Sequence, residues 1–171
     1  MAAVDFITAL GRVLHDGTLR DAFAHDATAF VKTIDLRESD QASFLRLSPT
    51  DLEVQARVLL RKRFDQVRRL LPRTCQALGK SAWEHFVVSV RSSEAYGNDT
   101  KVQDAYRFCT HVARVQTSGV CAREFNRCRF AISRRGVSLH LVKESGRIPA
   151  IQLFVRLRGE RWREWRIYAG V

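Results

Sequence analysis

The sequence predicts an α+β protein, with an N-terminal helical bundle followed by a C-terminal antiparallel sheet of about four strands. Apolar residues recur every three or four positions through residues 4–115 and every second position from residue 123 onward. The later segment also breaks at turn-forming residues at intervals of about 8–12 residues, which is typical of an antiparallel meander. Helices that precede strands in this way favour an arrangement in which helices cover one face of the sheet.

The first helices follow from the spacing of apolar side chains. Residues 4–16 carry one apolar helical face, and residues 18–34 are predicted as a single second helix. A shorter helical segment is predicted over residues 39–47. The apolar positions of the first helix are Val4, Ile7, Leu10 and Leu14.

The longest predicted helix has clear boundaries. Ser48 is expected to cap it and Pro49 to occupy its first position. Pro72 ends this helix and opens a short helical turn that Gly79 closes. Two further helices are predicted, over residues 81–93 and 100–115.

The remaining chain is predicted to form the sheet, so we expect a division into residues 1–117 and residues 118–171. Each predicted strand alternates apolar and polar side chains between turn-forming residues. The four predicted strands are residues 123–133, 137–143, 147–158 and 161–169.

The last predicted strand has two mixed faces. Neither face is purely apolar, which disfavours a place in the middle of a buried sheet. We therefore expect an edge strand, or a strand whose outer face is covered by another molecule. One face carries Trp162, Glu164, Arg166 and Tyr168, and the other carries Arg161, Arg163, Trp165 and Ile167.

This strand also supplies most of the candidate binding residues. Arginine and aromatic side chains are enriched where proteins meet, and an exposed sheet edge can bind an extended peptide through main-chain hydrogen bonds. These features favour a protein or peptide partner. The candidate peptide- and partner-binding residues are Trp162, Trp165, Tyr168, Arg161, Arg163, Arg166, Arg127 and Arg129.

Positive charge gathers in the same part of the chain, so nucleic-acid binding by a basic sheet is the alternative. The net charge is +11, of which residues 1–115 contribute +3 and residues 116–171 contribute +8. Phosphate contacts require such charge. However, the sequence has no helix-turn-helix signature, zinc module or RNP-type aromatic pair, and we do not expect nucleic acid to be the partner.

The sequence favours neither an independent enzyme nor a metal site. The four cysteines form no CxxC pair, the five histidines are scattered singly, and GxSxG, P-loop, HExxH and GxGxxG motifs are missing. We therefore expect no catalytic residue, no metal ligand and no cofactor in this chain. No apolar run is long enough to cross a membrane and the N-terminus lacks a basic signal-peptide region, so we expect a cytoplasmic protein without membrane contact.

The helical part resembles a known family. The similar segments are LRDAF (residues 19–23), the helix–Pro–helix–Gly run QARVLLRKRFDQVRRLLPRTCQALG (residues 55–79) and the aromatic helix start SAWEHF (residues 81–86). They resemble the small partner proteins of multinuclear non-haem iron oxidases that modify peptides. Length and the basic, strand-rich C-terminus are most similar to the MbnC family, the partner subunits of methanobactin-forming oxidases. The helical resemblance covers residues 5–115, mostly at apolar and capping positions.

The resemblance implies a non-catalytic subunit in a heterodimer with an iron-containing barrel oxidase. Such a subunit helps to bind the leader segment of a precursor peptide, while the oxidase uses iron and dioxygen to convert core cysteines to oxazolone and thioamide groups. The iron then belongs to the partner, and this chain holds no cofactor. Residues 1–117 are expected to be scaffold and oxidase-docking surface, and residues 118–171 to bind leader and partner. The arginines are expected to pair with carboxylates of the oxidase, or of the peptide if its leader is acidic.

Overall fold

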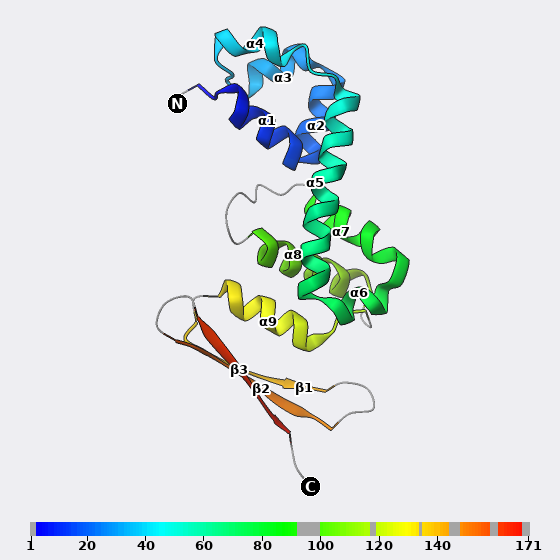
Figure 1. Cartoon of the computed structure of the whole chain (residues 1–171), viewed down its shortest axis with the longest axis vertical. Coiled ribbons are helices and arrows are strands. Elements are labelled where there is room, and N and C mark those ends of the chain that lie inside the picture. Colours follow the sequence, from blue (N-terminus) through cyan, green and yellow to red (C-terminus); the bar gives the residue numbers. More distant parts are fainter. Residues whose placement is uncertain are drawn as a thin grey trace. The chain divides into compact units, whose positions relative to one another are not determined.

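The structure is a computed structural model that describes residues 3–91, 100–116, 119–133, 135–143, 148–157 and 161–168. Within these residues, helices precede a three-stranded antiparallel sheet, which confirms the predicted α+β class (Figure 1). The chain forms two compact units, each assembled from two stretches of sequence. They are Met1–Gln66 with Trp83–Thr100, and Val67–Ala82 with Lys101–Val171.

The first unit is helical. Asp5 and Asp16 each accept a hydrogen bond from a backbone N–H in the first turn of the helix that follows. Asp26 has extended backbone angles and accepts from the backbone N–H of Ala29 at 2.9 Å, which begins a new helix. The prediction of one helix over residues 18–34 is therefore wrong. The elements are α1 (Phe6–His15), α2 (Gly17–His25), α3 (Ala27–Thr33), α4 (Glu38–Phe44), most of α5 (Pro49–Leu70) and most of α7 (Ala82–Val90).

Aromatic rings form the centre of this unit. The ring of Phe44 makes edge-to-face contacts with Phe6 and Phe23, each at 5.5 Å between centroids. Phe23 contacts Phe30 in the same way at 5.6 Å. Edge-to-face pairs stabilise a fold by more than the burial of their surface area, so these rings fix how the first four helices pack.

The second unit combines helices with the sheet. As predicted, Pro72 lies at the start of a short helix that Gly79 ends, with the positive φ (56°) that glycine tolerates. Its elements are the end of α5, α6 (Pro72–Leu78), η1 (Gly79–Ser81), nearly all of α8 (Thr100–Val115), α9 (Ala122–Ile132), β1 (Val137–Val142), β2 (Ala150–Arg156) and β3 (Trp162–Tyr168).

A buried glutamate joins α9 to the start of α6. The Glu124 carboxylate accepts hydrogen bonds from the backbone N–H groups of Arg73 and Thr74, both at 2.9 Å. The Thr74 hydroxyl donates a third at 2.7 Å and accepts one from the backbone N–H of Cys121 at 3.1 Å. The carboxylate thus satisfies donors at a helix N-terminus, where no backbone acceptor is available.

The segment predicted as the first strand, residues 123–133, is helix α9. This helix lies against one face of the sheet, and it also contacts other helices of its unit (Figure 1). Phe130 stacks on Phe154 of β2 with ring centroids 5.0 Å apart, whereas Phe125 stacks on Tyr106 of α8 at 5.6 Å. A helix that is buried on two sides needs apolar residues on both, and the resulting pattern can imitate the alternation of a strand.

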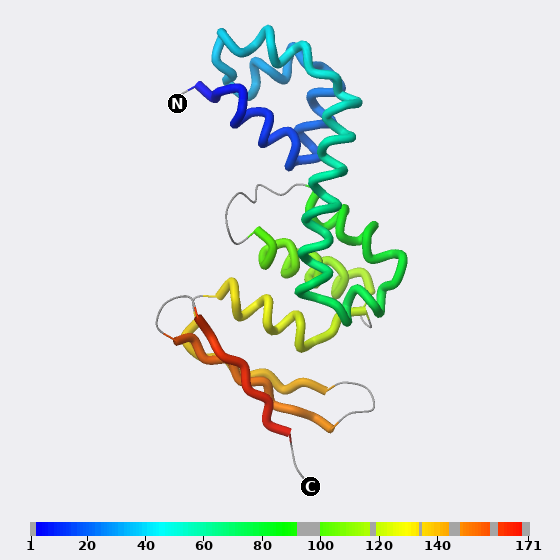
Figure 2. Tube along the Cα trace, in the orientation of Figure 1, coloured from blue at the N-terminus to red at the C-terminus, as the bar shows by residue number. Residues whose placement is uncertain are grey.

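The three strands of the described sheet run in the order β1-β2-β3, each antiparallel to the next (Figure 2). Leu139 of β1 pairs with Leu153 of β2, which pairs with Trp165 of β3. The last strand therefore lies at an edge, as the mixed faces of its sequence predict. The order of the strands in the sheet is their order along the chain, which is the order of a meander.

Candidate protein- and peptide-binding surface

One face of the sheet is apolar and exposed, and we call it the outer face. Alternate residues of the three strands line up across it, and all but Arg163 are apolar. Leu139 is 64% exposed, Leu141 76% and Ile167 55%, although each is a large aliphatic side chain. The outer face consists of Val137, Leu139, Leu141, Ile151, Leu153, Val155, Arg163, Trp165 and Ile167.

Such a face is uncommon on an isolated protein. Monomers rarely expose large contiguous apolar patches, and those that exist mark protein or membrane contacts. Alternation along a strand indicates which residues share a face within it, but the strand register is what joins the apolar residues of β1 and β2 to Trp165. Among the described residues no helix is long and apolar enough to span a membrane.

The opposite face, which we call the covered face, packs on α9. The ring of Trp162 makes edge-to-face contacts with Phe130 at 5.9 Å and with Phe154 at 5.6 Å. The Arg156 guanidinium donates to the backbone carbonyls of Phe130 (3.1 Å) and Ser133 (2.6 Å) at the end of α9. Trp162 is therefore half-buried between helix and sheet, and Trp165 lies on the outer face.

Glu164 is the centre of a polar network on the covered face. Its carboxylate accepts two hydrogen bonds from Arg127 of α9, one from Gln152 at 3.1 Å and one from Arg166 at 3.3 Å. Burial alone would raise the pKa of Glu164, but hydrogen bonds and the charge of Arg127 outweigh it and lower the pKa below its ordinary value. Glu164 is therefore ionised at neutral pH, and it orients two of the predicted binding arginines.

The other predicted residues occupy different places. Arg163 is exposed on the outer face, and Arg161 is exposed next to it. Arg129 is exposed on α9. Tyr168 is 57% exposed at the end of β3. The eight predicted binding residues thus do not form one cluster, because Arg127 and Arg129 belong to a helix and the strand residues divide between two faces.

The edge of β3 is a second feature for binding. β3 pairs with β2 on one side only, and no other strand among the described residues pairs with it. An edge strand presents unpaired N–H and C=O groups to an added strand. A chain bound there would extend both faces of the sheet.

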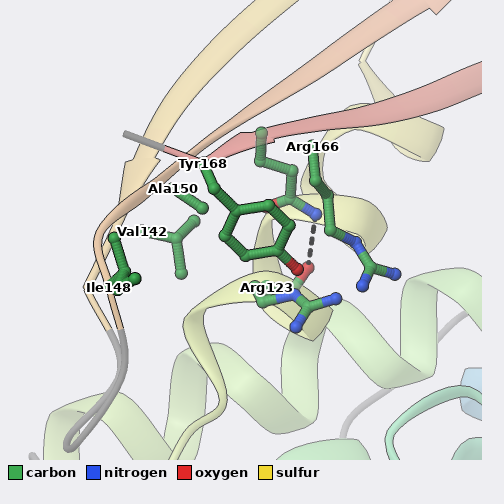
Figure 3. Close-up of a pocket in the computed structure, with 7 residues that line it drawn as sticks. Arg123, Val142, Ile148, Ala150, Arg166 and Tyr168 are labelled. Carbon is green, nitrogen blue, oxygen red and sulfur yellow. Dashed lines mark hydrogen bonds between the residues drawn. The ribbon is translucent and has the colours of Figure 1, made fainter. Parts of the chain in front are cut away.

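A pocket of about 220 Å³ opens between the covered face and the start of α9 (Figure 3). Its apolar part comprises Val142, Ile148 and Ala150, which lie on one side of the Tyr168 ring. The guanidinium groups of its two arginines lie toward the other side. The sequence does not reveal this pocket, because its residues come from every strand and from a helix predicted as a strand. The lining residues are Arg123, Val142, Ile148, Ala150, Gln152, Arg166 and Tyr168.

The four cysteines are buried or half-buried. All four are free thiols in the second unit, and burial is the main cause that raises the pKa of Cys75 to about 11 and of Cys128 to about 12. These two thiols are therefore protonated at neutral pH. The residues that the structure describes contain no group of three or more His, Cys, Asp or Glu side chains arranged to hold a metal ion.

Comparison with known proteins identifies no relative. No protein-family model, curated protein or solved structure matches the chain.

Proposed function

We propose that this chain is a non-catalytic partner subunit of an iron-dependent, peptide-modifying oxidase of the methanobactin-forming type. In this proposal it binds the oxidase and the leader segment of the precursor peptide, and the oxidase supplies the iron. The observation that carries the proposal is the exposed apolar outer face, since burial of apolar surface favours association and faces of this kind mark sites of protein contact. The resemblance of residues 5–115 to small oxidase partners then suggests the class of partner.

The outer face is the proposed docking surface for the oxidase. The row of Val137 and Val155 ends at Arg163, and Arg161 lies beside that end of β3, so the surface combines an apolar centre with a basic margin. Interfaces are commonly built in this way, with a desolvated apolar centre and a polar rim. The oxidase surface is accordingly expected to be apolar with acidic residues at its margin.

The edge of β3 is the proposed site for the leader peptide. An extended peptide added there gains main-chain hydrogen bonds, and its alternate side chains contact the two faces of the sheet. Trp165 would contact side chains on the outer face, and Tyr168 those on the covered face. The helical part serves as scaffold, and the outer face of the sheet supplies the docking surface for the oxidase.

The distribution of arginines disfavours the alternative of nucleic-acid binding. Arg127 and Arg166 bind the Glu164 carboxylate, and Arg156 binds carbonyl groups of α9. The outer face is apolar, whereas phosphate contacts require cationic side chains along a continuous surface.

Reconstitution tests the proposal. The chain purified alone should contain no stoichiometric iron and leave precursor peptides unmodified. Mixed with its oxidase, precursor peptide and dioxygen, it should be required for oxazolone and thioamide formation, monitored by mass spectrometry. Peptide modification by the chain alone, or full activity of the oxidase without it, would contradict the proposal.

A further inference from the structure

We infer that a groove between α1 and α5 binds an amphipathic helix of another protein. The groove lies within the first compact unit and has a volume of about 560 Å³. Leu10 and Leu14 line it from α1, and Leu52, Gln55 and Leu59 line it from α5. The groove takes no part in the proposed binding of oxidase and leader, so a failure of either would leave the other standing.

Helix α1 carries more apolar surface than its own unit buries. Ala9 and Val13 are 1% and 0% exposed in the core. Leu10 and Leu14 each follow one of these residues, and they are half-buried at the groove. Ile7 lies three residues before Leu10 and seven before Leu14, so it shares their helical face, yet it is 73% exposed. The order around α1 is therefore core, groove and exposed apolar side chain.

Helix α5 repeats this order. Ala56 is 0% exposed in the core, and Gln55 and Leu59 line the groove. Val54 and Val58 each come one position before these two lining residues, on the adjacent row of the helix, and they are 55% and 47% exposed. Both helices thus present exposed apolar side chains along the margins of one apolar groove.

A third helix is the partner that such a groove fits. Helices pack ridges of side chains into the grooves of their neighbours, and an amphipathic helix binds an apolar groove in the same way. From Ser48 to Leu59 the chain rises about 16 Å along α5, which is roughly three turns of a bound helix. A small molecule within the groove would leave Ile7 and the two valines in water, whereas a helix about 10 Å across can contact them.

The charged end of the groove fits the last turn of the bound helix. Arg46 and Asp51 line it where α5 begins, and within the part of the chain that the structure describes neither side chain has a hydrogen bond or ion pair. The last carbonyls of a helix lack partners inside it, and basic side chains are favoured beside them. Arg46 can donate to these carbonyls, and Asp51 can bind a lysine of the same turn. The bound helix therefore runs antiparallel to α5 and ends in a basic turn.

A synthetic helix tests this inference on the full chain. The probe is an acetylated, amidated, alanine-rich peptide of about 18 residues, because much shorter isolated helices are marginal in water. Leucines every three or four positions give it one apolar face, and lysines occupy its last turn. One twin has the same composition with its leucines spread over all faces, and a second twin carries glutamine in place of each lysine. NMR titration of the backbone amides measures the affinity and locates the bound peptide.

The variants place a charge on either margin of the groove. They are Ile7→Glu and Val54→Glu, and the control is Val88→Glu on α7, a position that is 60% exposed in the same unit. All three side chains are more than half exposed, so the variants should fold, which circular dichroism verifies. Asp51→Asn tests the contact with the last turn.

We expect the probe to bind about tenfold more tightly than the twin with scattered leucines, because only the probe can bury all its leucines at once. Ile7→Glu and Val54→Glu should each weaken binding by about tenfold, since each removes an apolar contact. Val88→Glu should leave binding unchanged. Asp51→Asn should weaken binding of the probe about threefold and leave binding of the glutamine twin unchanged.

Three results would overturn parts of this account. Equal binding of the probe and the twin with scattered leucines, or amide shifts confined to the sheet, would overturn docking of a helix in the groove. Equal effects of Asp51→Asn on the lysine and glutamine peptides would overturn the assigned direction of the helix. Dimerisation of the chain alone, observed by sedimentation and abolished by Ile7→Glu, would show that the occupant is a second copy and would overturn a helix of another protein.

Discussion

The guanidinium of Arg127 on α9 donates two hydrogen bonds to one carboxylate oxygen of Glu164 on β3, at 3.0 Å from Nε and 2.8 Å from Nη2. This contact joins the helix that covers the sheet to the strand at its edge. The position of the edge strand depends on such contacts across the covered face. Binding of the leader peptide, which is proposed at that edge, depends on them as well.

Breaking this pair should destabilise the fold moderately. Glu164 has 12% of its side chain exposed and Arg127 37%, so part of the attraction is screened by solvent. We expect Glu164→Gln and Arg127→Ala each to lower the free energy of unfolding by about 1–2 kcal/mol. Urea unfolding of both variants and the double variant measures this. Additive losses would show that the two residues do not interact.

The same carboxylate predicts a dependence on pH. The pKa of Glu164 in the folded protein is lower than its ordinary value of 4.5. As the pH falls through 4.5, the unfolded chain therefore binds more protons than the folded protein. The stability difference between wild type and Glu164→Gln should be full at neutral pH. It should shrink as the pH falls through that value toward the lower folded pKa. A difference that stays constant to acid pH would contradict the assigned pairing.

Glu124 is expected to matter more for stability. It is 5% exposed, and removal of its carboxylate leaves the N–H groups of Arg73 and Thr74 and the Thr74 hydroxyl without their acceptor. We expect Glu124→Ala to cost about 3 kcal/mol and Glu124→Gln less, because an amide oxygen can still accept. Thermal unfolding followed by circular dichroism measures both. Equal stability of wild type and Glu124→Ala would contradict the described contacts.

Two tryptophans of β3 should respond differently to truncation. Trp162 packs between Phe130 and Phe154, so Trp162→Ala should lower the free energy of unfolding by about 2–3 kcal/mol. Trp165 is 41% exposed on the outer face, so Trp165→Ala should cost less than about 1 kcal/mol. Binding of the oxidase should instead weaken in Trp165→Ala by about 2 kcal/mol. Chemical denaturation and titration calorimetry separate the two effects. A larger loss of stability in Trp165→Ala than in Trp162→Ala, with weaker oxidase binding in Trp162→Ala, would contradict the strand register.

Burial should protect two cysteines from alkylation. Cys109 and Cys128 are at most 4% exposed, and burial raises the pKa of both thiols. Iodoacetamide should modify them only when the protein unfolds, since the thiolate is the reactive form. The half-buried Cys75 should also react slowly, because its pKa is raised to about 11. Peptide mapping after timed labelling tests this. Rapid labelling of Cys109 in the native protein would show that its surroundings open readily.

The sequence predicts the elements with strong local signals. Ser48 accepts from the backbone N–H of Asp51 at 3.3 Å, and Pro72 and Gly79 delimit α6. These features depend on residues a few positions apart. Likewise, mixed faces along residues 161–168 suffice to predict an edge strand.

The sequence does not reveal features that depend on distant residues. Alternation over residues 123–133 predicts a strand because α9 is buried by helices on one side and by the sheet on the other. The four-residue spacing of buried Glu124 and Cys128 is the helical signal within it. The outer face needs the pairing of Leu139, Leu153 and Trp165, and strand alternation alone does not specify that register.

The most direct measurement of the central claim is recovery of the tagged chain from its native cells, followed by identification of bound protein and assay of iron. The test variant is Leu139→Glu on the outer face, and the control is Val88→Glu, an equally apolar and exposed position (64% and 60%) in the helical unit. Wild type and Val88→Glu should yield a one-to-one complex with an iron-containing protein, and Leu139→Glu should not. Recovery of nucleic acid without a protein partner, or an undiminished complex with Leu139→Glu, would contradict the proposed role of the outer face.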